Sequence, residues 1–272
     1  MKQIKISQSL VKDYDSFIKE DLCGFEFESK YITGEWDRTW NDSDSKALGR
    51  YFEYILTGAM PTGYNEYPKA KYLATVQKKL DKDSSFIPDV KDMLSQYRFA
   101  HEQAVKARKL IDKSGIKIES SQVYRTKGIM TGNIDVEATL NGDNVNIDIK
   151  YSGMIYNRWE KFGWMWTPVQ MNYNGIQAKH YQILNGRPTY FLVVSSDSKK
   201  PVIKFFKAEI DPFDLEIYEA YCDSLPEKIE TISEVGWVNF PSLEKCEGCP
   251  LKSKCPDKID KLIPEVIYIQ SN

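Results

Sequence analysis

Hydrophobic residues recur along the chain with two different periods, and the change of period separates helices from strands. Helical spacing predicts helices over residues 7–22, 42–56, 68–113 with a break near Pro88, 168–185 and 211–232. Strict alternation of apolar and polar residues predicts strands over residues 116–125, 130–140, 144–152, 188–196 and 202–210. This order of elements predicts an α/β fold in which helices flank a mixed central sheet.

The second and third of these strands are predicted to form a tight hairpin. Asn141-Gly142 lies between them, and this dipeptide is typical of a two-residue turn in which both residues take positive φ. With these two residues as the loop, Asp135 faces Asp148 across the strands, at a Cβ separation of roughly 5 Å. Lys150 follows Asp148 by two residues and therefore shares its face of the sheet.

Two carboxylates in this arrangement need a compensating charge. Like charges that face each other directly destabilise a sheet, and a divalent cation such as Mg²⁺, which prefers oxygen ligands, removes the conflict. Lys150 can hold an attacking water or stabilise negative charge on a phosphate, and Glu137 is a reserve ligand on the face of Asp135. The alternative is an exposed hairpin whose charges face water.

Two pairs of residues, each four apart, lie on the predicted flanking helices. Gly49 and Glu53 share one helix face, where the glycine permits close approach and Glu53 can complete a metal shell. Gln177 and Tyr181 share a face of the later helix, and their amide and hydroxyl can bind a phosphate or a base edge. The alternatives are an ordinary exposed glutamate for the first pair and a helix side that touches the sheet for the second.

Three of the five cysteines are clustered near the end of the sequence. Cys246, Cys249 and Cys255 have the spacing C-x2-C-x5-C, and three such thiolates can bind one zinc ion or iron–sulfur cluster, both of which usually take four ligands. Cys23 and Cys222 are the remaining thiols, and the spacing does not decide between them for the fourth position. The alternative is a set of reduced cysteines without a ligand.

Composition and absent motifs narrow the class of protein. No apolar run approaches the roughly 20 residues of a membrane span, and the N-terminal sequence lacks the apolar stretch of a signal peptide, so we expect a cytoplasmic protein without membrane contact. The two histidines, His101 and His180, and the lack of a Gly-x-Ser-x-Gly elbow or a phosphate loop argue against a serine hydrolase and a nucleotide-driven motor. The net charge of −2 does not exclude a nuclease, because metal-binding acids lower the total and only a local basic groove is needed.

Taken in order, these motifs resemble those of the RecB-like branch of the PD-(D/E)xK nuclease superfamily, over nearly the whole chain. The three motifs of its active centre are matched by Gly132 with Asp135 (G-x-x-D), Asp148 with Lys150 (D-x-K) and Gln177 with Tyr181 (Q-x-x-x-Y). The tail cysteines resemble those of its iron–sulfur members, the CRISPR-associated adaptation nucleases and the nuclease domains of AddAB-type helicase–nucleases. Many members carry a metal-binding His four residues after a helix glycine, where this chain has Glu53, the residue type that other branches use.

The resemblance implies a restriction-endonuclease-like fold and a single nuclease domain over residues 1–272. Within it we expect a helical insertion at 60–113, the catalytic sheet and Q-x-x-x-Y helix at 114–210, and a cysteine-rich tail at 236–272 that packs on the N-terminal helices. Family members supply the fourth cluster ligand from near the N-terminus, which points to Cys23 and to a [4Fe–4S] cluster, with zinc as the alternative.

The activity implied is metal-dependent hydrolysis of DNA, by an exonuclease that acts on single-stranded ends. Mg²⁺ or Mn²⁺ would be held by Glu53, Asp135, Asp148 and the carbonyl of Ile149, while Lys150 would orient the nucleophile or stabilise the transition state. The Q-x-x-x-Y residues would position the strand. Partners of this kind of nuclease are helicases, recombination or adaptation proteins, and further copies of the chain. The alternatives are a non-catalytic DNA-binding adaptor on a nuclease fold and a zinc-stabilised domain that binds partners.

Overall fold

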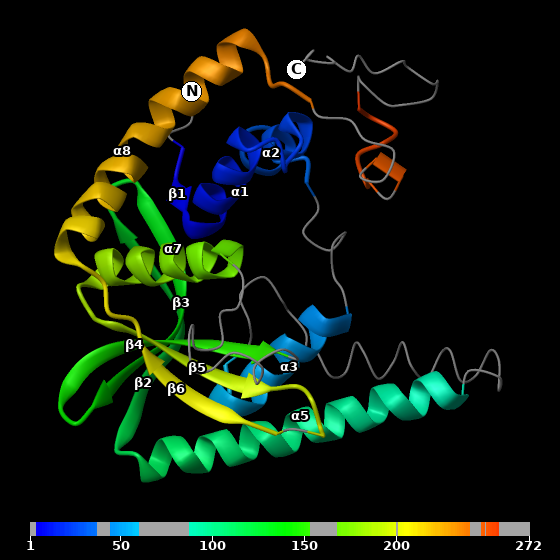
Figure 1. Cartoon of the computed structure of the whole chain (residues 1–272), viewed down its shortest axis with the longest axis vertical. Coiled ribbons are helices and arrows are strands. Elements are labelled where there is room, and N and C mark those ends of the chain that lie inside the picture. The colour runs from blue at the N-terminus through cyan, green and yellow to red at the C-terminus, as the bar shows by residue number, and fades with distance from the viewer. Residues whose placement is uncertain are drawn as a thin grey trace, which may run out of the picture. The chain divides into compact units, whose positions relative to one another are not determined.

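A six-stranded mixed sheet organises the larger part of the structure, a computed structural model (Figure 1). Its strands are β1 (Ile6–Ser7), β2 (Ile116–Lys127), β3 (Met130–Leu140), β4 (Asp143–Ser152), β5 (Thr189–Ser195) and β6 (Ile203–Lys207). The order is β1-β3-β4-β5-β6, with β2 paired to β3. The β1–β3 and β4–β5 pairs are parallel and the others antiparallel. The predicted α/β class with a mixed central sheet is therefore confirmed, and it is consistent with a restriction-endonuclease-like fold.

The residues that the structure describes are 4–36, 44–59, 87–152, 168–199, 201–239, 246–247 and 249–255. The chain divides into two compact units, one of Met1–Gln8 with Asp42–Ser224 and one of Ser9–Asn41 with Leu225–Asn272. The sheet belongs to the first unit. The predicted division into insertion, catalytic sheet and tail stays a prediction, and residues 60–86 of the insertion lie outside the described residues.

Two helices, α3 (Asp44–Thr57) and α5 (Ile87–Lys113), cover one face of the sheet (Figure 1). The buried side chains of α5 recur at helical spacing, at Tyr97, Ala100, Ala104, Ala107 and Ile111. Three alanines in this stripe let the helix pack closely against α3 and the strands. Pro88 lies in the first turn of α5, where proline needs no hydrogen-bond partner for its nitrogen.

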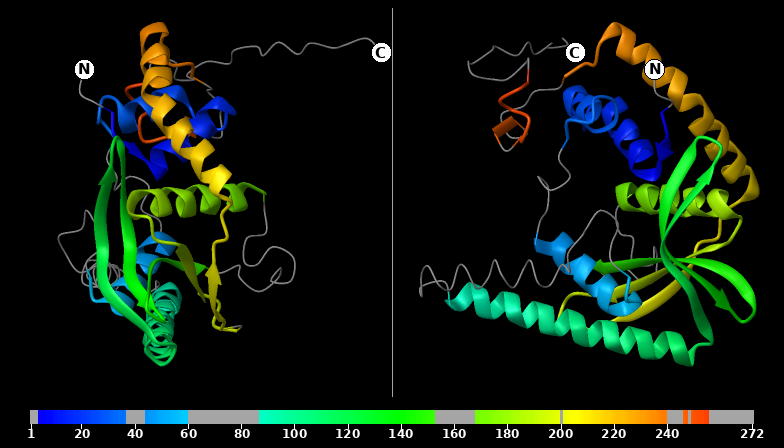
Figure 2. Two further views of the ribbon diagram at one scale, coloured as in Figure 1. Left: turned by 90° about the vertical axis from the view of Figure 1, so that its left-hand side faces the viewer. Right: turned by 180° about the vertical axis from the view of Figure 1, so that it is seen from behind.

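The opposite face of the sheet is covered by α7 (Pro168–Asn185), which Figure 2 shows from two further sides. This helix links β4 to β5, as expected because parallel neighbours need a crossover connection. Ala178 on α7 packs with Phe191 and Val193 on β5, whereas Leu192 and Val194 point to the α3–α5 face. The two faces of β5 are thus both apolar, which explains its continuous hydrophobic run.

The second unit holds α1 (Gln8–Ile18), α2 (Gly24–Tyr31) and the C-terminal turns of α8 (Pro212–Val235). Its core is aromatic, with ring contacts among Tyr14, Phe17, Phe27, Tyr31 and Trp237. The sequence pattern missed α2, a helix of 8 residues. It begins at Gly24, where an added Cβ would stand 2.3 Å from the carbonyl oxygen of Val238, so only glycine fits this close approach.

No helix within the described ranges is long and apolar enough to cross a membrane. The first predicted helix ends earlier than expected, at Ile18 rather than residue 22, and Glu20 beyond it takes a positive φ of 63°. The last predicted helix runs on to Val235.

Candidate active site

The β3–β4 hairpin has the predicted turn and register. Asn141 and Gly142 have φ values of 53° and 96°, as a two-residue turn of this type requires. Leu140 pairs with Asp143, and the ladder continues in that register to the pair of Val136 with Ile147. The next positions are Asp135 and Asp148, and the backbone N–H of Ile149 donates to Oδ2 of Asp135 at 2.9 Å.

Asp148 is fully buried and is held by one cation and one amide. Nζ of Lys150 lies 2.5 Å from its Oδ2, and Nε2 of Gln177 donates to its Oδ1. Nζ of Lys150 also donates to Oε1 of Gln177 at 2.9 Å, while Nε2 of Gln177 lies 3.0 Å from the hydroxyl of Tyr181. The strand pair and the Q-x-x-x-Y residues of α7 therefore form one hydrogen-bonded group.

Glu53 on α3 joins this group from the other flanking helix. Burial and then repulsion by Asp148 raise the pKa of Glu53 to about 7 from 4.5. Burial, followed by the charges of Glu53 and Asp148, raises the pKa of Asp135 well above its ordinary value. Burial alone would lower the pKa of Lys150, but the surrounding carboxylates outweigh it and raise the pKa. We call Glu53, Asp135, Asp148 and Lys150 the Asp148 cluster; it holds more carboxylates than cations.

The Asp148 cluster has the donor set that a hard divalent cation takes, because its carboxylates are oxygen ligands with an excess of negative charge. In the described part of the chain, no three His, Cys, Asp or Glu side chains converge closely enough to form a finished metal site. The carboxylates are instead held by Lys150, Gln177 and an amide from β2. The assignment of a metal to Glu53, Asp135, Asp148 and the Ile149 carbonyl stays a prediction.

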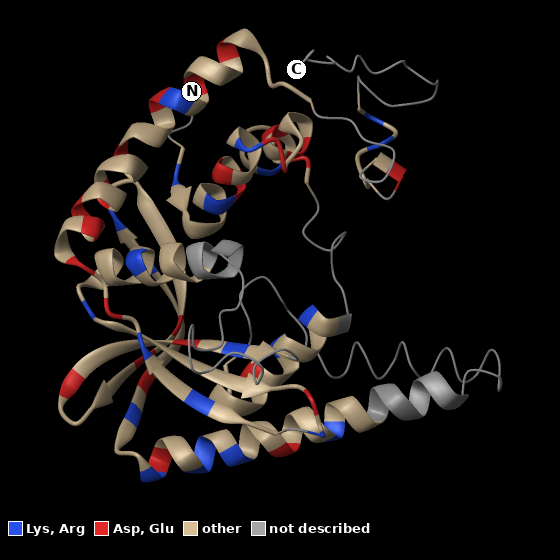
Figure 3. Ribbon diagram, in the orientation of Figure 1, with Lys and Arg blue, Asp and Glu red and all other residues tan. Residues whose placement is uncertain are grey.

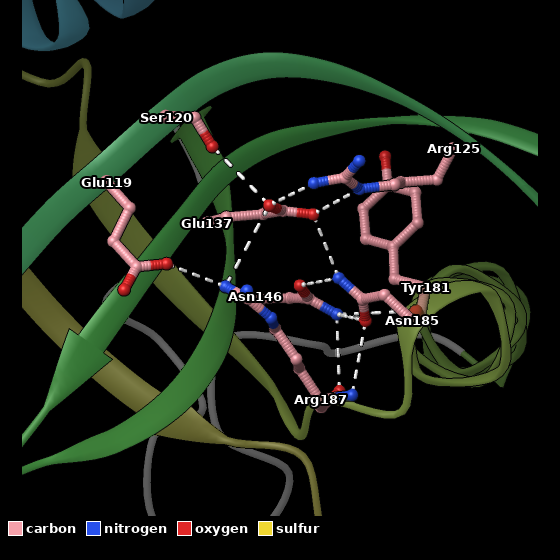
Figure 4. Close-up of polar contacts among 8 residues, drawn as sticks. All are labelled: Glu119, Ser120, Arg125, Glu137, Asn146, Tyr181, Asn185 and Arg187. Atoms are coloured by element: carbon pink, nitrogen blue, oxygen red, sulfur yellow. Dashed lines mark hydrogen bonds and ion pairs between the residues drawn. The ribbon is translucent and has the colours of Figure 1, made fainter.

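Glu137, the reserve ligand of the sequence interpretation, belongs to a different group (Figure 4). Arg125 on β2 binds it in a bidentate way, through Nε at 2.7 Å and Nη2 at 2.6 Å. Asn185 donates to it at 3.0 Å, and Nη1 of Arg187 lies 3.8 Å away. These contacts, the Arg125 hydrogen bond above all, lower the pKa of Glu137. We call Glu137, Arg125, Asn185 and Arg187 the Glu137 cluster.

The Glu137 cluster fixes the C-terminal end of α7 to the sheet. Asn185, the last residue of α7, exchanges hydrogen bonds with the buried side chain of Asn146 on β4 at 2.9 and 2.8 Å. Asn146 also donates to the backbone oxygen of Tyr181 at 3.3 Å. The sequence interpretation named none of the arginine or asparagine partners, because only the folded register brings them to Glu137.

Gly132, the glycine of the G-x-x-D motif, lets α7 pack tightly on β3. An added Cβ would stand 2.9 Å from Cδ1 of Leu184 and 3.7 Å from Cε1 of Tyr181. His180 beside it is fully buried, with Nε2 2.9 Å from the backbone oxygen of Thr131 and Nδ1 3.0 Å from the Tyr218 hydroxyl. His180 therefore has structural partners, as a core histidine does.

Gly49 has no comparable role. Among the described residues, no atom outside its own helix turn lies within 4 Å of an added Cβ there. The close approach expected at Gly49 stays a prediction, because no described residue makes it, whereas Glu53 one turn later does reach the Asp148 cluster.

Four of the five cysteines lie in the second unit: Cys23, Cys246, Cys249 and Cys255. Burial raises the pKa of the Cys249 thiol, and the charges of Glu26, Cys23 and Cys246 act in the same direction. Sγ of Cys23 lies 3.4 Å from Oδ1 of Asn239. Cys222 is fully buried in the part of α8 that belongs to the first unit. The assignment of a cluster to the four cysteines stays a prediction.

The charges of the two long helices differ in sign (Figure 3). The described side chains of α5 include the basic residues Arg98, Lys106, Arg108, Lys109 and Lys113 against the acidic Glu102 and Asp112. Along α8 the acidic residues predominate, with Lys228 as the one basic residue in the sequence of that helix. Although the net charge of the whole chain is −2, the described part of α5 is therefore a basic stretch in the unit that carries the Asp148 cluster.

Comparison with known proteins establishes the fold and no more. No protein-family model and no curated protein matches the sequence. The structure is similar to the crystal structure of a protein named "Putative exonuclease" from Eubacterium rectale, with a TM-score of 0.57, 16% sequence identity and coverage of 98% of this chain and 91% of the other. The crystal structure of SSO0001 gives a TM-score of 0.30, with 12% identity and coverage of 68% and 81%, which is too low to support an argument. The first similarity shows that this chain shares the fold of that protein.

Proposed function

We propose that this protein is a metal-dependent deoxyribonuclease that removes nucleotides from single-stranded ends. The observation that carries the proposal is the Asp148 cluster, in which Asp135, the fully buried Asp148 and Lys150 lie on the sheet and Glu53 reaches them from α3. Structural groups of buried charge are normally balanced by their partners, whereas this one keeps an excess of negative charge and raised carboxylate pKa values. Strongly perturbed groups of this kind favour a functional site.

Glu53, Asp135 and Asp148 would hold Mg²⁺ or Mn²⁺, which would lower the pKa of a bound water and neutralise phosphate charge. Two contacts, to Asp148 and to Gln177, hold the ammonium group of Lys150 in place. Its ammonium group would bind a non-bridging phosphate oxygen and stabilise the charge that grows there during hydrolysis. Tyr181 and Gln177 would hold the strand, and the basic residues of α5 would attract the nucleic acid backbone.

The test is a cleavage assay on end-labelled single- and double-stranded DNA with Mn²⁺, Mg²⁺ or EDTA. We expect metal-dependent trimming of single-stranded ends, lost in Lys150→Ala and kept in Lys127→Ala, a matched change of an exposed lysine paired with Glu219. Equal cleavage by wild type and Lys150→Ala would refute the assignment. DNA binding without cleavage by folded wild type would favour a non-catalytic adaptor.

For the second unit we propose that Cys23, Cys246, Cys249 and Cys255 bind a [4Fe–4S] cluster. Two points support this. The charges of Cys23 and Cys246 act on the Cys249 thiol and help to raise its pKa, and iron–sulfur clusters prefer four thiolate ligands. Anaerobically purified protein should then absorb at about 400 nm. Cys249→Ser should remove this absorption band, while Cys222→Ser should keep it. A colourless protein that contains one equivalent of zinc would assign zinc instead.

A further inference from the structure

One residue inside a strand has a backbone conformation that its side chain disfavours. Gln122 has a φ of 53° although it lies within β2, and this left-handed region is sparsely populated by residues other than glycine. Asn141 also has a positive φ, but there the hairpin turn requires it. No turn occurs at Gln122, so the conformation needs another reason.

The register of β2 and β3 places the irregular residue beside the active-site strand. Ser121 pairs with Val136 and Val123 pairs with Ile134, so Gln122 stands opposite Asp135. A shift of register lies just before it, between Ile118 and Ser120. Bulges of this kind commonly occur next to active sites, where they redirect a side chain.

The faces of β3 confirm that the strand is irregular at this point. Gly132 faces α7, because its added Cβ would meet Leu184, and Glu137 also faces α7, because Asn185 donates to it. These two positions of β3 are an odd number of residues apart, and in a regular strand they would lie on opposite faces. The break in alternation falls between them, in the stretch of β3 that includes Asp135.

The redirected side chain reaches the Asp148 cluster. Nε2 of Gln122 donates a hydrogen bond to Oε1 of Glu53, across 69 residues of sequence. Glu53 is a long side chain on a different element, α3, and the charge of Asp148 repels it. A fixed amide donor holds its carboxylate in one orientation and offsets part of that repulsion.

We propose that Gln122 is a positioning residue, which holds the Glu53 carboxylate ready to bind the divalent cation. This inference rests on the proposed metal site. It explains why an unfavourable backbone conformation is kept inside β2, since only there does the amide reach Glu53. Partners that orient metal ligands in this way typically contribute roughly ten- to a hundredfold in metal affinity.

The variants that test this are Gln122→Gly and Gln122→Asn, because both residues tolerate positive φ and neither carries an amide that reaches Glu53. Both should fold and be as stable as wild type or more so, measured by urea unfolding in EDTA. Both should also bind Mn²⁺ roughly tenfold more weakly or worse, measured by electron paramagnetic resonance of free Mn²⁺. The Mn²⁺ concentration for half-maximal cleavage should rise by the same factor, with kcat at saturating Mn²⁺ nearly unchanged.

Ser121→Ala, on the same strand and outside the cluster, is the control and should keep the wild-type affinity. If Mn²⁺ binding is lost in Asp148→Asn but unchanged in both Gln122 variants, the role of Gln122 is refuted and the metal site stands. If wild type itself binds no Mn²⁺, the metal-dependent function and the role of Gln122 are refuted together. Reduced stability of the Gln122 variants with unchanged Mn²⁺ affinity would show a structural role and overturn the inference.

Discussion

Two groups of charged residues each include a residue of β3 and each contact α7, and they are built in opposite ways. In the Glu137 cluster a carboxylate that is 2% exposed has two arginines beside it, and the second arginine also pairs with Glu119. In the Asp148 cluster three carboxylates share one lysine, and the charge of Arg50 on α3 also acts on Glu53. The pKa of Glu137 is accordingly lowered, whereas those of Glu53 and Asp135 are raised.

We infer that the difference separates charge that stabilises the fold from charge that serves the proposed function. The Glu137 cluster is close to electrically balanced and ties Asn185 to β3 and β4, so we infer that it stabilises the fold. The Asp148 cluster has three carboxylates for one lysine, and it gains balance by taking up positive charge, either as protons on Glu53 and Asp135 or as a bound cation. The following changes test whether the two clusters can be separated in this way.

The largest effect is expected on activity. Asp148→Asn keeps the size of the side chain but removes a metal-binding charge, and kcat for cleavage should fall on the order of a thousandfold. The matched change Glu137→Gln should keep kcat within about threefold, because Glu137 contacts no residue of the Asp148 cluster in the described structure. Similar losses of kcat in both variants would show that the two clusters act as one.

The next effect is on the free energy of unfolding. Glu137→Ala removes a buried acceptor of Arg125 and Asn185 and should destabilise the protein by about 2–3 kcal/mol. The urea midpoint measures this, with Asp148→Asn in EDTA as the comparison. That change loses the attraction to Lys150 but relieves the repulsion with Glu53 and Asp135, so it should cost less than about 1 kcal/mol. If Asp148→Asn is the more destabilised variant, the assignment of structural and functional clusters is reversed.

The dependence of stability on pH should have opposite signs for the two clusters. The pKa of Glu53 is raised in the folded protein, so its contribution is full below its unfolded pKa and is lost as the pH rises through about 7. Without metal, wild type should lose about 1–2 kcal/mol relative to Glu53→Gln between pH 5 and 8. The pKa of Glu137 is lowered, so its contribution is instead lost in acid. Thermal unfolding in EDTA from pH 5 to 8 measures the Glu53 effect, and parallel profiles for wild type and Glu53→Gln would contradict it. The loss for Glu137 lies below its ordinary pKa of 4.5, so it is measured by the same method in more acidic buffer.

The smallest effect is expected at the edge of the Glu137 cluster. Arg187 lies 3.8 Å from Glu137, farther than either nitrogen of Arg125, and it pairs mainly with Glu119 near the surface. Arg187→Ala should therefore reduce the free energy of unfolding by less than about 1 kcal/mol, and Arg125→Ala by more. Urea unfolding of the two variants side by side ranks them, and an equal loss would show that distance does not set their contributions.

The features that the sequence predicted correctly are those that depend on residues close together in the chain. The Asn141-Gly142 turn and the alternation around it fixed the β3–β4 register, because a turn of two residues leaves a single register that buries Val136 and Ile147. The same periodicities located α3, α7 and strands β2 to β6 to within a few residues, whereas β1, a strand of 2 residues, was not predicted. Glu53 and Gln177 were singled out by their helical spacing of four from Gly49 and Tyr181, and the resemblance to nuclease motifs then added their expected roles.

Features that depend on distant partners were not predicted. The helix α2 is short, and its aromatic residues find their partners on α1 and at Trp237. The role of Gln122 depends on a register shift in β2 for which no local residue pattern is known to us. The partners of Glu137 likewise follow from that register, which sets Ser120 opposite it, and from the end of α7.

The tight β3–β4 turn has a consequence for the order of folding. A hairpin closed by two residues forms within microseconds, while the contact of Glu53 with Gln122 closes a loop of 69 residues at a much larger entropic cost. Asp135 and Asp148 should therefore meet while water still surrounds them and screens their repulsion. Burial of the acids then arises only when α7 and α3 dock on the hairpin, so a cation in the proposed metal site should accelerate the last folding step more than the first.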